Sequence, residues 1–514
     1  MSTLPYEVWV HIISYLPDGP LEKLMGVSAV FLHAALDRRY RAVDIARLSR
    51  TGVAKLERLR DPFIAKRVRT LAIVTGSLDL LKTWQSFEHS RRSSWRKRLL
   101  SLKTSAKKLI LPKDSEHNVA LRKLARTRPT KKTTAEMIQL LMSIIPKMTN
   151  IQYLSVSWFG FREDPTAREP AYLQVAWPAV GENLRQLRIH MDPCRLPTIA
   201  SHLPNLRKLE DIHVTVLHSE MIPVKEPQVI WKMLASLYNK FADSLQVLSF
   251  AIFSNLDMSD FFTELGYFPH LRELRIEMVL DEKHLSDPSG LRRLLKDHSA
   301  TLERLDLGTD PHFYCAAGWP QRIMPQTHFP KLKALLLVLD DDIEEYATPR
   351  TEIPLQVQQL FPGLDSMVLT GRYLEPEEVL SWVEAFTNIT SNSSLRKLEL
   401  QIKLLSKEVL DVLANAFPTL ESLCLHCQWA GTPESPEVHQ PDNFMETMKG
   451  VSYPEWQLRN LALLWNYHTS SEDDSEEAVV FLTVALSIPC MKNVQINKTG
   501  GGSWIAFGGG FLTT

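Results

Sequence analysis

The chain has 514 residues, of which 44% are hydrophobic and 23% charged, and its formal net charge is zero. This length exceeds one compact core of ordinary size, so we expect several domains or a repeat array. The balanced charge gives no sign of nucleic-acid or membrane-surface binding. The sequence has no run of about 18 apolar residues, so we expect no membrane-spanning helix. With five scattered cysteines and no recognisable secretory signal at its start, the chain is expected inside the cell, in the cytoplasm, the nucleus or both.

Residues 4–45 predict three short helices. Pro5 suits the first turn of a helix, Pro20 is expected to start a second helix, and Ser28 can cap a third. Three short helices bury little apolar surface, so this unit either needs a partner or serves to cap whatever follows it. The apolar positions at helical spacing in the first two helices are Val8, Ile12, Tyr15, Leu16, Leu21 and Leu24.

This segment resembles the F-box motif, in which Leu-Pro-x-Glu is followed by Tyr-Leu-Pro, Leu-x-x-Leu and Val-Ser elements. F-box proteins dock on the small Skp adaptor, which connects them to the cullin and RING subunits of a ubiquitin ligase. The resemblance implies an F-box over residues 1–45. The adaptor contacts that it implies are Leu4, Pro5, Val8, Ile12, Tyr15, Leu16, Leu21, Leu24, Val27 and Ser28.

A second motif, Leu-x-x-Leu-x-Leu, recurs through the rest of the chain. Its central apolar positions include Leu274, Leu305, Leu335, Met367 and Leu398, which lie 30 to 32 residues apart. Such a period is typical of a solenoid, in which each motif forms a short strand and neighbouring units stack to bury their apolar side chains. Helical patterns fill several of the intervals, at 228–242, 288–297, 376–386, 407–417 and 476–486.

The combination resembles the F-box and leucine-rich-repeat proteins of fungi. It implies an α/β fold, with an F-box helical bundle and an irregular leucine-rich-repeat solenoid that has strands on its concave side and helices on its convex side. We expect early irregular repeats over 46–149, the main array over 150–498, and a hairpin with a glycine-rich tail over 499–514. A basic segment, 91–132, fits a solvated insertion, which we favour, or a nuclear-import or anion-binding patch.

No motif for catalysis or for a cofactor is evident in the sequence. The chain lacks a phosphate loop ending in Gly-Lys-Ser/Thr, a Gly-x-Ser-x-Gly elbow and a His-Glu-x-x-His pair. Cys424 and Cys427 form a Cys-x-x-Cys pair, but an offset of three on a strand places them on opposite faces. We therefore interpret them as structural thiols and expect no catalytic residue, no metal site and no cofactor.

The outward strand positions are expected to line the concave side and to bind a target protein. Several are charged, whereas in mid-array they become apolar, and an exposed apolar patch rimmed by charge is typical of a protein-binding site. The alternative is that helices or the tail cover these residues. The predicted target contacts are Arg275, Glu277, Arg304, Asp306, Leu336, Val338, Val368, Glu399, Gln401 and His426.

Taken with the resemblance, these features favour the substrate-recognition subunit of an SCF-type ubiquitin ligase. The F-box would hold the Skp adaptor, the repeats would hold an unidentified target protein, and the chain itself would carry no catalytic residue. One alternative is a leucine-rich-repeat interaction scaffold that is not coupled to ubiquitin transfer. A repeat-fold enzyme is a third hypothesis, and neither nucleic acid nor a membrane is expected as a partner.

Overall fold

The computed structural model divides the chain into two compact units, residues 1–224 and 225–514, which are described one at a time. No helix in the described part of the chain is long and apolar enough to cross a membrane. Leu4 and the basic segment 91–132 lie outside the described residues. The described residues are 5–24, 27–45, 50–74, 134–158, 171–181, 183–203, 206–217, 227–253, 256–308, 323–324, 328–338, 363–387, 395–432, 441–465, 474–498 and 501–506.

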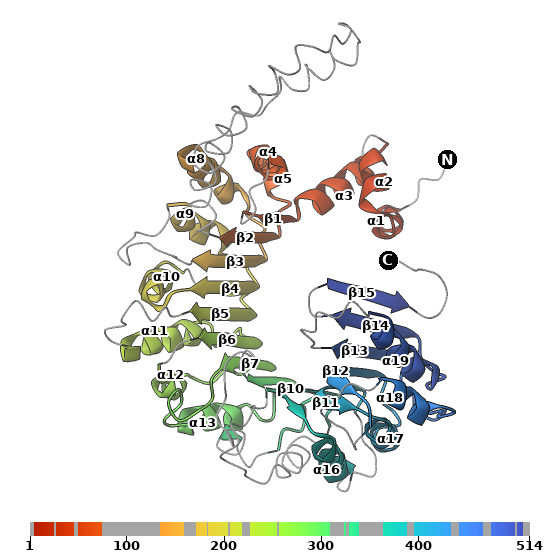
Figure 1. Ribbon diagram of the computed structural model, residues 1–514. Coiled ribbons are helices and arrows are strands. Elements are labelled where there is room, and N and C mark those ends of the chain that lie inside the picture. Colours follow the sequence, from red (N-terminus) through yellow and green to blue (C-terminus); the bar gives the residue numbers. More distant parts are fainter. Residues whose placement is uncertain are drawn as a thin grey trace, which may run out of the picture. The chain divides into compact units, whose positions relative to one another are not determined.

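Unit 1 begins with three helices (Figure 1), and their buried side chains form a small apolar core. Ser28 caps the third helix, because its hydroxyl accepts a hydrogen bond from the backbone N–H of Phe31. The second helix begins at Asp18 and not, as predicted, at Pro20. A proline fits this first turn because N–H groups there have no intrahelical acceptor. The helices are α1 (Tyr6–Ser14), α2 (Asp18–Leu24) and α3 (Ala29–Tyr40), and their core consists of Ile13, Leu21, Phe31 and Ala35.

The remainder of unit 1 is built on a parallel sheet. Among its described residues five strands pair in chain order, each with the next. Helices α8, α9 and α10 lie along one side of these strands (Figure 1). The strands are β1 (Ala42–Asp44), β2 (Thr70–Val74), β3 (Tyr153–Trp158), β4 (Gln186–Met191) and β5 (Asp211–Leu217). The helices are α4 (Arg50–Arg58), α5 (Pro62–Ala65), α8 (Thr134–Ile144), α9 (Ala171–Val180) and α10 (Leu196–His202), with 3-10 turns η1 (Ile145–Lys147) and η2 (Pro193–Arg195).

Unit 2 repeats the same plan. Its described strands β6 to β14 pair in parallel and in chain order, and β15 closes the series by pairing antiparallel with β14. The strands are β6 (Val247–Phe253), β7 (Glu273–Met278), β8 (Arg304–Gly308), β9 (Ala334–Val338), β10 (Ser366–Leu374), β11 (Lys397–Leu405), β12 (Ser422–Ala430), β13 (Asn460–Trp465), β14 (Asn493–Lys498) and β15 (Gly501–Ala506). The helices are α11 (Pro227–Asn239), α12 (Ser259–Glu264), α13 (Ser289–Asp297), α16 (Pro376–Thr387), α17 (Lys407–Ala416), α18 (Pro441–Met448) and α19 (Asp474–Leu486).

The strands of unit 2 align their apolar positions in register. Leu274 pairs with Leu305, which pairs with Leu335, and the series continues through Met367 and Leu398. Each of these side chains is no more than 2% exposed, so together they form a continuous buried ladder. Successive residues of a strand point to opposite faces, so the residues between them face outward. The leucine motif thereby sets both the core and the exposed face. Both units are therefore mixed α/β structures built on parallel strands.

Candidate functional site

The outward side chains of unit 2 form a row across seven neighbouring strands. Every member is partly exposed, and each pairs with the next member in the strand register. The row is charged at its β7 end, apolar in the middle and polar again on β11 and β12. In chain order its members are Arg275, Asp306, Leu336, Val368, Glu399, Cys424 and Ala462.

The β7 end of the row is a network of ion pairs. Arg275 Nη2 lies 2.6 Å from an oxygen of Glu273, and Arg304 Nε donates to Asp306 Oδ2 at 2.9 Å. Arg275 Nε lies 3.6 Å from the same Asp306 oxygen. Burial is the largest influence on Asp306 and raises its pKa, although the two arginines act in the opposite direction. Glu277 follows Arg275 on the same face and is also partly exposed.

The apolar middle of the row is smaller than the sequence predicts. Leu336 and Val368 are partly exposed, but Val338 is only 7% exposed, so the expectation that it lies on the exposed face is wrong. Val338 packs over Gly308 on the preceding strand, where an added Cβ would collide with the Val338 side chain. A residue without a side chain therefore leaves a space that Val338 fills.

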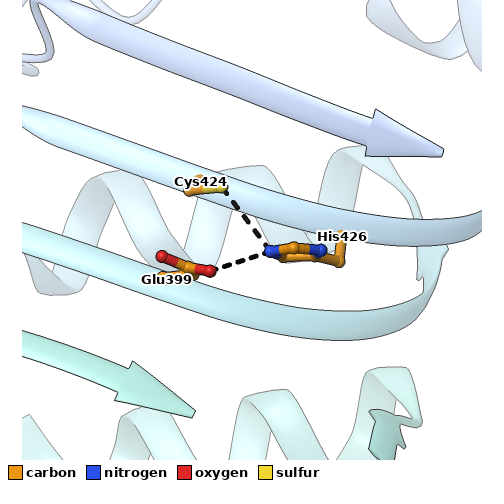
Figure 2. Close-up of side chains that lie close together, drawn as sticks. All are labelled: Glu399, Cys424 and His426. Carbon is orange, nitrogen blue, oxygen red and sulfur yellow. Dashed lines mark hydrogen bonds and ion pairs between the residues drawn. The ribbon is translucent and has the colours of Figure 1, made fainter. Parts of the chain in front are cut away.

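The polar group on β11 and β12 consists of Glu399, Cys424 and His426. Figure 2 shows that the carboxylate and the thiol approach the same edge of the imidazole. His426 Nε2 lies 2.9 Å from Glu399 Oε1 and 3.8 Å from Cys424 Sγ. Burial, and secondarily the Glu399 charge, raises the pKa of Cys424 to about 12, so the free thiol is protonated at neutral pH.

Two residues next to this group are Cys427 and Gln401. Cys427 is fully buried on the opposite face of β12, as expected from its offset of three, so the Cys-x-x-Cys pair does not converge on one point. Gln401 lies directly opposite His426 in the register and two residues after Glu399. Its Oε1 is buried and has no hydrogen-bond partner among the described residues.

The residues matched to the F-box motif divide into exposed and buried ones. Val8, Ile12 and Tyr15 are 40%, 39% and 75% exposed, and their spacing places Val8 and Ile12 on one face of α1 with Tyr15, which directly follows the helix, in line with them. Val27, which precedes α3, is 67% exposed. Leu21 is 1% exposed, so it offers almost no surface to an adaptor, contrary to its place among the predicted contacts. Three short helices offer few apolar side chains for a core, and Leu21 is one of those that form it.

The remaining matched residues differ in how far they are exposed. Pro5 and Ser28 are exposed, and the Ser28 hydroxyl is occupied in capping α3. Leu16 and Leu24 are partly buried and pack against the core of the three helices. Leu4 lies outside the described residues. Among the matched residues, the exposed apolar side chains are therefore Val8, Ile12, Tyr15 and Val27, and Leu32 on α3 is also 38% exposed.

Comparison with known proteins adds nothing to this picture, because no family model matches the chain and no curated protein matches it. Glu273 and Cys424, which take part in the contacts described above, were not among the target contacts predicted from the sequence. Cys424 was considered only together with Cys427. The signal that was available is that Cys424 and His426 alternate on one strand, while Glu399 occupies the matching position of the strand before.

Proposed function

We propose that this chain is the substrate-recognition subunit of an SCF-type ubiquitin ligase, and that its three N-terminal helices are an F-box that docks the Skp adaptor. The observation that carries the proposal is the exposed apolar stripe of Val8 and Ile12 on α1 and Tyr15 at its end, called the α1 stripe below. The helices also bury a core of their own, so the stripe is surplus to folding. A contiguous exposed apolar surface on a small unit is expected to be covered by a partner.

Unit 2 has the complementary role in this proposal, as a leucine-rich-repeat solenoid that presents a target protein. Parallel strands in chain order and an in-register apolar ladder support a repeat architecture. The exposed row, with charged side chains beside an apolar middle, supports protein binding. Holding a target near the conjugating enzyme raises its effective concentration, so the chain needs no catalytic residue. The proposed place of action is inside the cell.

The adaptor-docking surface can be tested with a matched pair of valines. Val8→Glu places a charge in the proposed interface, whereas Val229→Glu makes the same change on α11, where the valine is 48% exposed. We expect the intact chain and the Val229→Glu variant to bind the purified Skp adaptor equally. Val8→Glu should weaken binding at least tenfold, which corresponds to about 1.4 kcal/mol, because a carboxylate would be desolvated without a partner.

Three further outcomes are informative. An intact chain that does not bind the adaptor overturns the proposal. Equal loss of binding in both valine variants would assign the effect to general destabilisation and not to the α1 surface. If the adaptor binds but cullin is not recruited with it, the chain is an interaction scaffold that is not coupled to ubiquitin transfer.

A further inference from the structure

The strand register brings three side chains with metal-binding chemistry to one point of the exposed row. Glu399 on β11 pairs directly with Cys424 on β12, and His426 follows two residues later on the same face. Glu399 Oε1, Cys424 Sγ and His426 Nε2 all lie within 4.8 Å of one another. Carboxylate, thiolate and imidazole are the three side-chain ligand types that zinc uses in proteins.

The distances are close to those of a loaded site. With bonds of about 2.0–2.3 Å and tetrahedral angles, ligand atoms around zinc are about 3.3–3.6 Å apart. The nitrogen–sulfur distance of 3.8 Å has to close slightly, and the nitrogen–oxygen distance of 2.9 Å has to open slightly. Both adjustments are small relative to zinc–ligand bonds of about 2.0–2.3 Å, and the carboxylate oxygen and the sulfur lie within 4.8 Å of each other.

The geometry also argues against a catalytic triad. In a triad the base uses one ring nitrogen toward the nucleophile and the other toward the carboxylate. Here the same nitrogen of His426, Nε2, faces both Glu399 and Cys424 (Figure 2). One nitrogen cannot relay a proton between two such groups, whereas three donor atoms that converge on one point can share a cation.

We propose that Glu399, Cys424 and His426 bind one zinc ion. Coordination replaces the thiol proton of Cys424, which is released to solvent, and the two anionic ligands balance the charge of the ion. His426 and Glu399 are 25% and 34% exposed, so a fourth ligand from water or from a bound protein can reach the metal. Gln401, whose Oε1 lacks a partner among the described residues, is placed opposite His426 to assist that ligand. The site is independent of the proposed ligase function.

The test uses the full-length protein and Zn²⁺, with affinity measured by competition against a chromophoric chelator. Co²⁺ in place of Zn²⁺ reports the ligands, because a cobalt–thiolate bond gives a charge-transfer absorption band. We expect a tight site with one equivalent of metal and a thiolate band. Cys424→Ser should abolish the band and weaken Zn²⁺ binding at least tenfold, while Cys490→Ser, which removes an exposed thiol elsewhere, should change neither.

A third variant separates metal binding from a structural hydrogen bond. Glu399→Gln retains a hydrogen-bonding group beside His426 but is a poorer metal ligand, so it should keep the wild-type melting temperature without metal and lose at least tenfold in Zn²⁺ affinity. Far-UV circular dichroism checks that each variant is folded. Absence of a tight site in the intact chain, or metal binding that survives Cys424→Ser unchanged, overturns the proposal.

Discussion

At the scale of single residues, His298 is a fully buried imidazole directly after α13. Its ring stacks on Tyr267 with the centroids 4.9 Å apart, and its Nε2 accepts a hydrogen bond from the backbone N–H of Phe268 at 3.5 Å. Burial lowers the pKa of His298 to about 4, and the nearby Asp297 carboxylate opposes this only in part. The folded protein therefore holds a neutral imidazole at neutral pH.

This burial should make the protein less stable as the pH falls. The unfolded chain protonates His298 near pH 6.5 and the folded chain only near pH 4, so the unfolded state binds more protons between these values. Between about pH 7.5 and pH 5 the wild type should lose about 2 kcal/mol through this residue. His298→Gln keeps an acceptor for the Phe268 N–H but cannot titrate. Urea unfolding of both proteins at the two pH values measures the difference between them.

The expected result is that the stability advantage of the wild type over His298→Gln shrinks by about 2 kcal/mol at the lower pH. All other titrating groups are shared, so they cancel in this comparison. A difference that does not change with pH would mean that protonation of His298 is not coupled to folding.

Single residues are also where the burial seen in the structure departs from the burial that the sequence pattern predicts. Val338 has the outward position that the period predicts, yet it is buried because Gly308 leaves room beneath it. Leu21 matches the motif, yet it is taken into the core of the three helices. Both outcomes depend on the neighbour across the register or across the helix pair. The periodicity of a sequence predicts the face on which a residue lies, but it does not show which residue packs against it.

At the scale of elements, Gly290 in the first turn of α13 allows a close approach to α12. A Cβ at this position would lie 2.7 Å from backbone atoms of Phe262 and Thr263. Backbone cannot rotate away as a side chain can, so Gly290→Ala should cost about 1–3 kcal/mol even after the gain of about 1 kcal/mol in helix propensity. Thermal or urea unfolding of the variant measures this loss.

Gly363 supplies a control in the same unit. It is exposed, and a Cβ there would meet only the carbonyl oxygens of Pro330 and Leu332, at 3.9 and 4.0 Å. Gly363→Ala should therefore leave stability within about 0.5 kcal/mol of the wild type. If both alanine variants melt together with the wild type, the two helices have room to separate and close packing does not explain Gly290.

Elements were predicted more accurately than contacts. The patterns over 376–386 and 407–417 correspond to α16 (Pro376–Thr387) and α17 (Lys407–Ala416), because proline and serine mark their starts. The leucine motifs predict strands correctly because their last two leucines are two residues apart, which is the spacing of side chains on one face of a strand. The start of α2 was misplaced by two residues, since proline is compatible with several first-turn positions. The convergence of Glu399 with Cys424 required the register, which no single motif contains.

At the scale of the whole molecule, the two proposed sites belong to different compact units. The α1 stripe lies in residues 1–224, and the metal site lies in residues 225–514. Each unit has a buried apolar core of its own. The two sites share no residue and belong to different units, so the two activities should be separable.

This separability is tested with Val8→Glu, Cys424→Ser and the double variant, each as the full-length chain. Val8→Glu should lose the Skp adaptor and retain Zn²⁺, whereas Cys424→Ser should lose Zn²⁺ and retain the adaptor. In the double variant each affinity should match that of the corresponding single variant within about threefold, because independent sites couple by less than about 0.5 kcal/mol. A larger change would show that metal binding and adaptor binding are linked, and the chain would then act as one coupled receptor and not as two independent modules.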